Sequence, residues 1–321
     1  MQANQMFVGV DVAKATLVIC VQGVSGKRTV ANDARSIQSW LKTLPEQAVV
    51  ATESTGRYHA LLARLVHRSG RNAYVLNARD VHLYAQGLGA RCKSDRVDAQ
   101  IIARYVAEHH AELHAWAPGS HAQEVVQALV QRRARIADHR AAVRQLLHGF
   151  KPLQPQLRQL EARFDALLAQ LDRQVDEQIA REPPMADGRT RLRTITGFGP
   201  QGSALLAVLM SRLRFANADA LVAYSGLDPR AKDSGTKRGR RRLSKRGSAA
   251  VRRQMYLAAF SAARSKALGA LYRSIKARGF APTEALVILA RKLLRIAWAV
   301  WKSGKPFDRT RLTAPVTCAQ L

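Results

Sequence analysis

The chain has 321 residues, 47% of them apolar, and its 52 Lys and Arg outnumber its 23 Asp and Glu to give a net charge of +29. This length exceeds what one hydrophobic core usually supports, and the apolar content excludes wholesale disorder, so two folded domains and a connector are expected. Such an excess of positive charge repels itself unless a polyanion offsets it, which makes nucleic acid the expected partner. The excess is concentrated in residues 234–321, where 21 Lys or Arg accompany two acids.

Two other classes of protein are excluded by what the sequence lacks. The N-terminus carries no signal-peptide core and no lipidation motif, and apolar stretches such as residues 285–290 are far too short to span a bilayer. Three scattered cysteines with no Cys-x-x-Cys pair fit neither a disulfide framework nor a zinc ribbon. We therefore expect a soluble protein of a reducing bacterial cytoplasm, associated with the nucleoid and not with a membrane.

The first part of the chain, residues 6–119, predicts an α/β fold. Short runs of apolar and β-branched residues alternate with amphipathic stretches. We expect helices near residues 34–44 and 58–67, and strands near residues 6–12, 16–22, 27–30, 48–53 and 72–76. Antiparallel strands followed by alternation of strand and helix predict a mixed sheet with helices on its faces.

The middle of the chain predicts two long helices. From residue 121 to residue 181 no strand pattern occurs, and Pro152 and Pro155 interrupt the helical pattern. The second helix carries apolar residues at three- and four-residue spacing, namely Leu157, Leu160, Phe164, Leu167 and Leu171. This stripe predicts either a coiled-coil seam that joins two copies or ordinary packing inside one domain, because a firm coiled-coil prediction needs about three to four heptads.

The last part of the chain predicts an all-α domain. Pro183-Pro184 and Asp187-Gly188 are typical of a boundary before it. Helices are expected near residues 203–213, 219–224, 247–266, 268–277 and 283–302. The sequence thus predicts an α/β domain over residues 1–119, a helical connector over 120–184 and a mostly helical domain over 185–321.

Four acids in the first domain have a spacing that suits a metal site. Asp11 and Glu53 each end a predicted strand, and open α/β sheets place their sites at the carboxyl ends of strands. Asp95 and Asp98, three residues apart at the start of an expected helix, share one helix face. Four carboxylates at one point repel one another unless a cation neutralises them, and oxygen ligands suit Mg²⁺ or Mn²⁺. Two such ions can activate a nucleophile and stabilise a leaving oxygen in phosphoryl transfer.

Each acid also has a purely structural explanation. Asp95 and Asp98 complement the positive end of a helix dipole, as acids in a first turn usually do. Glu53 fits an exposed strand end, and Asp11 fits an ordinary turn. The joint arrangement in a chain poor in acids, rather than any single residue, favours the metal.

A serine lies in the most basic part of the chain. Ser234-Gly235 precedes seven Lys or Arg in ten positions: Lys237, Arg238, Arg240, Arg241, Arg242, Lys245 and Arg246. Arginines beside a serine oxygen can stabilise the charge that develops on a phosphate under attack. The alternative is a Ser-Gly turn in a loop that only grips phosphates. Asp233 is adjacent, but spacing alone identifies no general base for Ser234.

A glycine-rich turn precedes the helix expected at residues 203–213. Gly197 and Gly199 lie in Ile195-Thr196-Gly197-Phe198-Gly199-Pro200, which resembles a helix-hairpin-helix. The backbone N–H groups of such a turn can hold a DNA phosphate. Glycines of this kind also form plain turns between packed helices.

These segments together resemble one known family. The acidic segments at residues 9–14, 53–56 and 93–99 are similar to the DEDD motifs of the insertion-sequence transposases of the one-ten family, which are related to Piv-type DNA invertases. The segments at residues 195–199, 226–229, 234–235 and 243–247 resemble that family's C-terminal transposase domain. The resemblance spans nearly the whole chain in the right order.

The resemblance implies a fold and a mechanism. It implies a RuvC-like (RNase H-type) first domain, a coiled-coil connector that dimerises, and a C-terminal transposase domain. Asp11, Glu53, Asp95 and Asp98 would bind Mg²⁺, and Ser234 would form a transient phosphoserine bond to DNA. The serine domain of one subunit would complete the acidic site of another, in a dimer or a tetrameric synaptic complex. A noncoding bridge RNA would pair with donor and target DNA.

Three functions compete at this point. The first is an RNA-guided DNA recombinase that mobilises its own insertion element. The second is a site-specific invertase or a Holliday-junction-type nuclease that uses the acids alone and needs no serine. The third is a noncatalytic nucleic-acid-binding protein whose acids are structural, and it predicts no metal-dependent chemistry.

Overall fold

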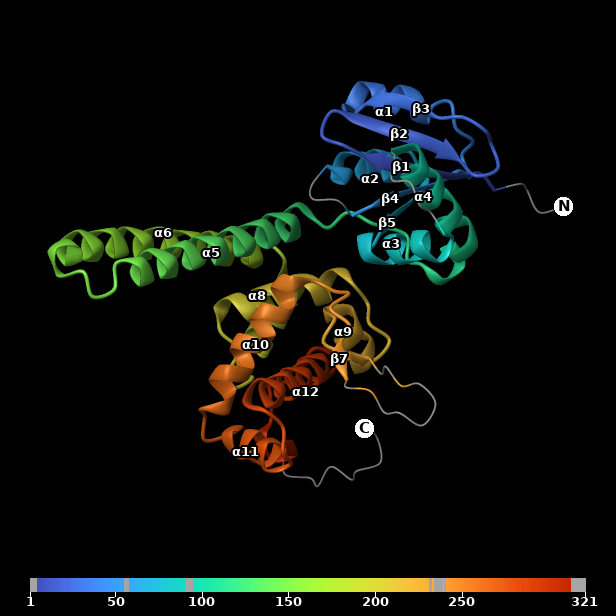
Figure 1. Ribbon diagram of the computed structural model, residues 1–321. Helices are drawn as coiled ribbons and strands as arrows, with labels where there is room; N and C mark the ends of the chain where they lie inside the picture. The colour runs from blue at the N-terminus through green and yellow to red at the C-terminus, as the bar shows by residue number, and fades with distance from the viewer. Residues whose placement is uncertain are drawn as a thin grey trace. The chain divides into compact units, whose positions relative to one another are not determined.

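The computed structural model describes residues 5–54, 58–89, 95–230, 233, 239 and 241–312, with backbone only at residues 95, 96, 311 and 312. The chain divides into two compact units, Met1–Pro118 and Gly119–Leu321 (Figure 1). Within the described ranges, no helix combines the length and the apolar character needed to cross a membrane.

The first unit contains a five-stranded mixed sheet. Its strands are β1 (Phe7–Val12), β2 (Thr16–Val21), β3 (Arg28–Ala31), β4 (Val49–Glu53) and β5 (Asn72–Leu76), in the spatial order β3-β2-β1-β4-β5. The first three strands pair antiparallel, whereas β4 is parallel to both β1 and β5. The mixed sheet predicted from the sequence is confirmed.

Helices cover both faces of this sheet. Alternate residues of β1 point to opposite faces, and Val8, Val10 and Val12 pack with α1 (Ala34–Leu41) and α2 (His59–Arg68). The opposite face packs against α3 (Ala78–Gly87) and α4 (Asp95–His109), and the short 3-10 turn η1 (His110–Glu112) follows α4. The sheet is therefore the middle layer of three (Figure 1).

Gly9 allows α4 to lie directly on β1. A Cβ atom at Gly9 would stand 2.1 Å from the carbonyl oxygen of Ala99 and 2.3 Å from the backbone nitrogen of Ala103. Ala99 and Ala103 are both fully buried. Backbone meets backbone here, so only glycine fits. This contact fixes the helix that carries Asp98 against the strand that carries Asp11.

The second unit is built from helices around one core. The helices are α5 (His121–Leu146), α6 (Gln154–Ala180), α7 (Pro183–Arg193), α8 (Pro200–Arg212), α9 (Ala218–Ser225), α10 (Ala249–Ala263), α11 (Gly269–Ala277) and α12 (Pro282–Ser303). Strands β6 (Pro229–Arg230) and β7 (Arg242–Leu243) and the 3-10 turns η2 (Lys151–Leu153) and η3 (Arg309–Leu312) complete it. The base of the α5–α6 hairpin, expected as a connector, contributes Val126, Val130 and Val175 to this core.

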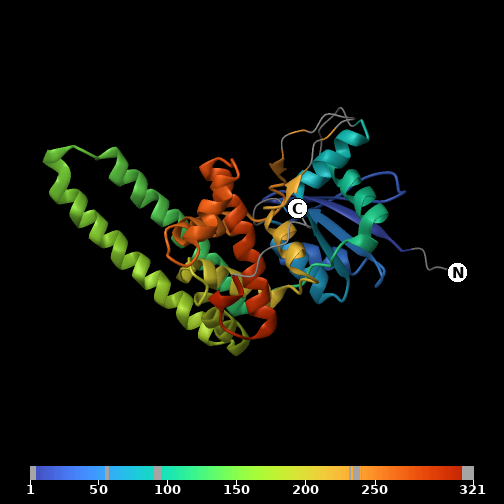
Figure 2. The same ribbon diagram turned by 90° about the horizontal axis from the view of Figure 1, so that it is seen from below.

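The helices α5 and α6 form a long antiparallel hairpin (Figure 2). Three ion pairs join them: Arg133–Asp172, Arg140–Asp165 and Arg144–Glu161. From one pair to the next, the residue number rises along α5 by as much as it falls along α6, so the three pairs fix one register between the antiparallel helices.

The apolar stripe predicted on α6 is divided between two environments. Leu157 is buried, whereas Leu160 and Leu167 are 43% and 44% exposed. Leu168, which lies outside the predicted stripe, is buried instead. Part of the stripe therefore packs inside the second unit, and part of it faces outward.

Asp187 and Gly188, expected at the boundary before the last domain, both lie within α7. Pro183 and Pro184 open this helix, where the missing N–H of proline costs nothing since first-turn amides have no intrahelical acceptor. Gly188 serves packing: a Cβ there would stand 2.0 Å from a ring carbon of Trp301.

Candidate functional site

Asp11 and Glu53 lie at the ends of neighbouring parallel strands. The registered pair of Val10 and Thr52 directly precedes them, and parallel strands lie about 4.8 Å apart. Both acids are half-buried. By the two-residue period of a strand they share the face of Gly9, which α4 covers. The structure therefore brings these two predicted residues together on one face.

The helix α4 carries the other two predicted acids. Asp98 is half-buried and directly precedes Ala99, which packs on β1. Asp95 begins α4, but its side chain lies outside the described residues. Among the described side chains, no three His, Cys, Asp or Glu residues come together as metal ligands. The strand-end pair alone still fits Mg²⁺, which proteins commonly hold through one or two carboxylates plus substrate phosphates and waters.

A short hairpin of β6 and β7 fixes the two ends of the basic loop. Pro229 pairs with Leu243, and Arg230 pairs with Arg242. Beyond the pairing, the backbone N–H of Ser244 donates to the carbonyl oxygen of Asp228 at 2.9 Å, and its hydroxyl donates to the Asp228 carboxylate. Ser244 is buried. The loop between the strands therefore begins and ends at a rigid base.

Two glycines pack this base against the end of α9. Gly226 takes a left-handed conformation (φ 71°) as the C-cap of α9. A Cβ at Gly247 would lie 1.9 Å from the carbonyl oxygen of Tyr224. Arg252 donates to the carbonyl oxygens of Ser225 and Gly247 at 3.2 and 2.5 Å, which holds the two segments together. This role of Arg252 was not predicted from the sequence, because a side-chain bond between two loops produces no periodic sequence pattern.

Asp233 anchors the described part of the basic loop. Its carboxylate accepts from the guanidinium of Arg241 at 2.6 Å and from the backbone N–H of Gly239 at 2.9 Å. Arg241, and then Gly239, hold the pKa of Asp233 below its ordinary value. A carboxylate stabilised in this way is a weak proton acceptor, so Asp233 is poorly suited to act as a general base.

The remaining predicted residues of the loop are only partly described. Ser234, Lys237, Arg238 and Arg240 lie outside the described residues. The side chains of Arg241, Arg242 and Lys245 are exposed, and that of Arg246 is half-buried. Arg241 is paired with Asp233, whereas Arg242 and Lys245 present their charges to solvent, where a polyanion can reach them.

The glycine-rich turn joins α7 to α8, as expected from the sequence. Gly197 has a φ of +99°, and a Cβ there would stand 2.4 Å from the carbonyl oxygen of Ala258. Gly199 is the N-cap of α8 and offers no side chain, so the first amides of α8 lack a side-chain cap. This geometry suits a phosphate, and phosphate binding by Gly197 and Gly199 stays a prediction.

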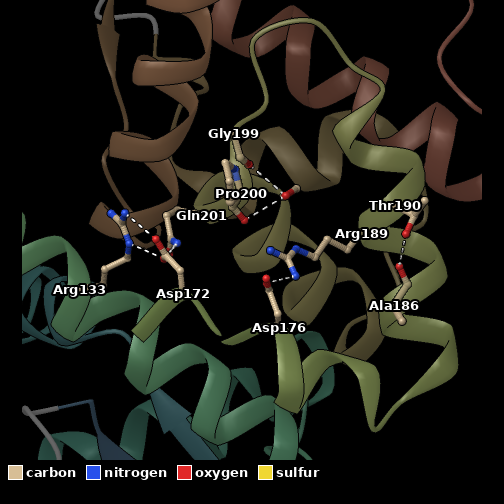
Figure 3. Close-up of polar contacts among 10 residues, drawn as sticks. Arg133, Asp172, Asp176, Ala186, Arg189, Thr190, Gly199, Pro200 and Gln201 are labelled. Carbon is tan, nitrogen blue, oxygen red and sulfur yellow. Dashed lines mark hydrogen bonds and ion pairs between the residues drawn. The ribbon is translucent and has the colours of Figure 1, made fainter. Parts of the chain in front are cut away.

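Side-chain contacts hold the start of α8 in place (Figure 3). The carboxylate of Asp172 accepts two bonds from the guanidinium of Arg133, at 2.5 and 2.9 Å, and a third from the amide of Gln201. On the neighbouring turn of α6, Asp176 pairs with Arg189 of α7 at 2.5 Å. The α5–α6 hairpin and the glycine-rich turn are therefore one rigid assembly.

Comparison with known proteins agrees with this architecture. Residues 8–152 match the transposase family model of the DEDD type of IS110, and residues 189–273 match the model described as "Transposase IS116/IS110/IS902 family". The pilin gene-inverting protein of Moraxella lacunata is 25% identical, over 95% of this chain and 98% of its own. The transposase for insertion sequence element IS1328 of Yersinia enterocolitica is 26% identical, over 95% of this chain and 99% of its own. The chain is thus an enzyme that belongs to the IS110/IS116/IS902 family of transposases.

Proposed function

We propose that this transposase mobilises an insertion element by Mg²⁺-dependent cleavage and exchange of DNA strands, with Ser234 as the covalent nucleophile. The observation that carries the proposal is the placement of Asp11 and Glu53 at the ends of adjacent parallel strands, on the face that α4 covers. The strand order, with three antiparallel strands followed by two parallel ones, supports a RuvC-like (RNase H-type) fold for the first unit.

In this proposal the metal is held by Asp11 and Glu53 from the sheet, with Asp95 and Asp98 from α4. Bound Mg²⁺ or Mn²⁺ supplies positive charge beside the reacting phosphate and favours departure of the leaving oxygen. Gly9 has the supporting role, because it sets the distance between α4 and β1.

The covalent step belongs to Ser234. Its Oγ attacks the phosphorus, an Oγ–P bond forms, the P–O bond to one DNA strand breaks, and that strand leaves as a hydroxyl. A hydroxyl end of the exchanging strand then attacks the phosphoserine, which restores Ser234 and closes a new phosphodiester. The number of phosphodiester-type bonds is conserved, so no external energy source is required. The basic residues around the serine stabilise the pentavalent phosphate, and the proton lost from Ser234 balances the proton that the leaving strand gains as it becomes a hydroxyl.

The proposed assembly contains donor DNA, target DNA, a noncoding bridge RNA and several copies of this chain. Residues 1–119 act as the acidic domain, 120–184 as the dimerising connector and 185–321 as the domain that carries the serine. The net charge of +29 supports binding of several polyanions at once. The outward-facing Leu160 and Leu167 support pairing of α6 with a second copy, in a dimer or a tetrameric synaptic complex.

A reconstituted reaction tests the proposal. Purified protein is incubated with the noncoding RNA that flanks its gene, donor DNA, target DNA and Mg²⁺. We expect recombination in the wild type, none in Asp11→Ala or Ser234→Ala, and a covalent protein–DNA species that is absent from Ser234→Ala. Glu112→Gln and Ser274→Ala, which alter an exposed acid and an exposed serine elsewhere, are the matched controls and should react normally. Full strand exchange by Ser234→Ala would disprove the serine mechanism.

Mixing the two inactive variants tests whether subunits share a site. If the serine of one copy completes the acidic site of another, Asp11→Ala and Ser234→Ala together should regain part of the activity. Recovery is expected only when both proteins are added before the DNA, so that mixed assemblies form. No recovery under these conditions contradicts a shared site.

Site-specific inversion is the second candidate function. It is favoured by the nearly full-length similarity to the pilin gene-inverting protein of Moraxella lacunata. A plasmid carrying two inverted sites distinguishes site-specific inversion from RNA-guided transposition, because an invertase inverts the intervening segment without RNA. Cleavage that needs Asp11 but not Ser234 would indicate a nuclease of the Holliday-junction type. Binding without any reaction in the wild type would indicate a noncatalytic protein.

A further inference from the structure

One face of α10 exposes two apolar side chains with a basic side chain at each end. Arg253, Leu257, Phe260 and Arg264 follow four-, three- and four-residue spacing, which places them on one side of the helix. Leu257 is 46% exposed and Phe260 is 41% exposed. The guanidinium carbon of Arg264 lies 3.9 Å from the centroid of the Phe260 ring. Exposed aromatic and aliphatic surface bordered by cations is typical of a binding surface rather than of a core.

A cavity adjoins this stripe. Its volume is about 510 Å³, within the range of small-ligand sites. The walls come from three places: Arg253 and Leu257 of α10, Arg133 of α5, and the glycine-rich turn with the first residues of α8. A Cβ at Gly199 would meet no heavy atom within 4 Å, so the turn leaves space on this side. The cavity and the exposed stripe share Arg253 and Leu257 and form one continuous surface, here called the α10 groove.

The charges of the α10 groove favour an anion. Arg253 is 41% exposed and is paired with Asp138, itself 59% exposed, so solvent screens this pair and leaves donors available. The uncapped first turn of α8 adds the positive end of a helix dipole. Among the described residues that line the cavity, none is acidic. An acidic protein segment would contact only the cations of this surface, and a purely apolar segment would contact only Leu257 and Phe260. A nucleotide can contact both, because its phosphate pairs with the cations and its flat base stacks on the aromatic ring.

We propose that the α10 groove binds an unpaired nucleotide of a nucleic-acid strand, with its base stacked on Phe260 and its phosphates held by Arg253, Arg264 and the start of α8. The inference rests on the proposed function only in that the strand belongs to the recombining DNA or its RNA guide. Stacking requires an exposed base face, so the groove discriminates single strands from duplex. It acts in binding and takes no part in the chemistry at Ser234.

Fluorescence anisotropy with the full-length protein tests the groove. The probes are labelled single-stranded DNA, single-stranded RNA and duplex DNA of one sequence, in EDTA so that no metal-dependent reaction occurs. Phe260→Ala should weaken single-strand binding by roughly 5- to 100-fold, the range for one lost stacking contact, and change duplex binding by less than about twofold. Phe260→Trp should restore single-strand binding. If Phe260→Ala weakens binding of single-stranded DNA more than that of single-stranded RNA, the groove binds a DNA strand, and the reverse result identifies an RNA strand.

The control variant is Arg278→Ala. Arg278 also lies over an aromatic ring, 5.4 Å from the centroid of Phe280, but outside the groove. It should bind all three probes like the wild type. The proposal is overturned if Phe260→Ala and Leu257→Ala bind single strands normally, or if they weaken all probes equally. It is also overturned if Phe260→Ala changes only the oligomeric state in sedimentation. This assay measures binding in EDTA, whereas the reconstituted reaction measures strand exchange, so a failed groove and a failed recombination mechanism remain distinguishable.

Discussion

Replacing Gly9 with alanine should destabilise the first unit more than its one added methyl group suggests. The new Cβ would stand 2.1 and 2.3 Å from backbone atoms of α4, which cannot rotate away as a side chain can. Overpacking of this kind costs about 1–3 kcal/mol, and contact with the backbone of α4 at both Ala99 and Ala103 places Gly9→Ala near the upper value. A loss of about 3 kcal/mol corresponds to a melting temperature lower by roughly 10–15 °C for a unit of this size.

Hydrogen exchange read by mass spectrometry measures this effect in each unit separately. Peptides from β1 and α4 should lose protection together in Gly9→Ala, whereas peptides of the second unit should not change. Gly87→Ala is the matched control, because a Cβ at Gly87 meets nothing within 4 Å and alanine suits a helix. Gly9→Ala protein with the protection of the wild type would show that α4 does not rest on β1 as described.

Three further predictions concern other parts of the chain. Gly188→Ala should lower the free energy of unfolding of the second unit by about 1–3 kcal/mol, because the new Cβ clashes with the Trp301 ring. Calorimetry should show that adding Trp301→Leu recovers part of this loss. If the effects of the two substitutions simply add, the contact between the residues is contradicted. Burial and then the bond to Glu108 raise the pKa of Tyr84 to about 12, so its stabilising effect is complete below pH 10 and lost as pH rises towards 12. Because burial also raises the pKa of Tyr224, ultraviolet titration should show late-titrating tyrosines, of which the one at Tyr84 moves towards 10 in Glu108→Gln. The absence of any shift in that variant would exclude the bond. Ser244→Ala should cost roughly 1–2 kcal/mol and accelerate amide exchange in β6 and β7, and unchanged exchange would remove Ser244 from the hairpin.

The strands of the first unit could be predicted because their pattern is local. A short run of apolar and β-branched residues is visible in the sequence of β1 and of β2, and their ends fell within about two residues of the predicted ones. The helix α3 was not predicted, although a capping signal exists: the side chain of Asn77 accepts from the backbone N–H of Arg79 at 2.9 Å. Its weak apolar face, with Val81 alone buried, explains the omission.

The candidate site was predictable to the extent that it depends on strand ends. Asp11 and Glu53 follow from the rule that strand ends carry sites, and the structure places them on adjacent strands. The bond between Ser244 and Asp228 was not predictable, because it joins residues 16 positions apart across a loop without periodicity. The helical position of Gly188 was also not predictable, because Gly188 packs against Trp301, which lies more than a hundred residues away in the sequence.

The matched ion pairs between α5 and α6 have a consequence for how this hairpin can vary in length. Its 26-residue first helix spans roughly 39 Å at 1.5 Å per residue. An insertion in one helix alone would shift Arg140 and Arg144 away from their acids, whereas equal insertions in both helices would preserve every pair. Length changes should therefore occur in equal steps near the tip. Removing seven residues from each helix, 134–140 from α5 and 165–171 from α6, should give a shorter hairpin in which Arg133–Asp172 and Arg144–Glu161 still pair in register.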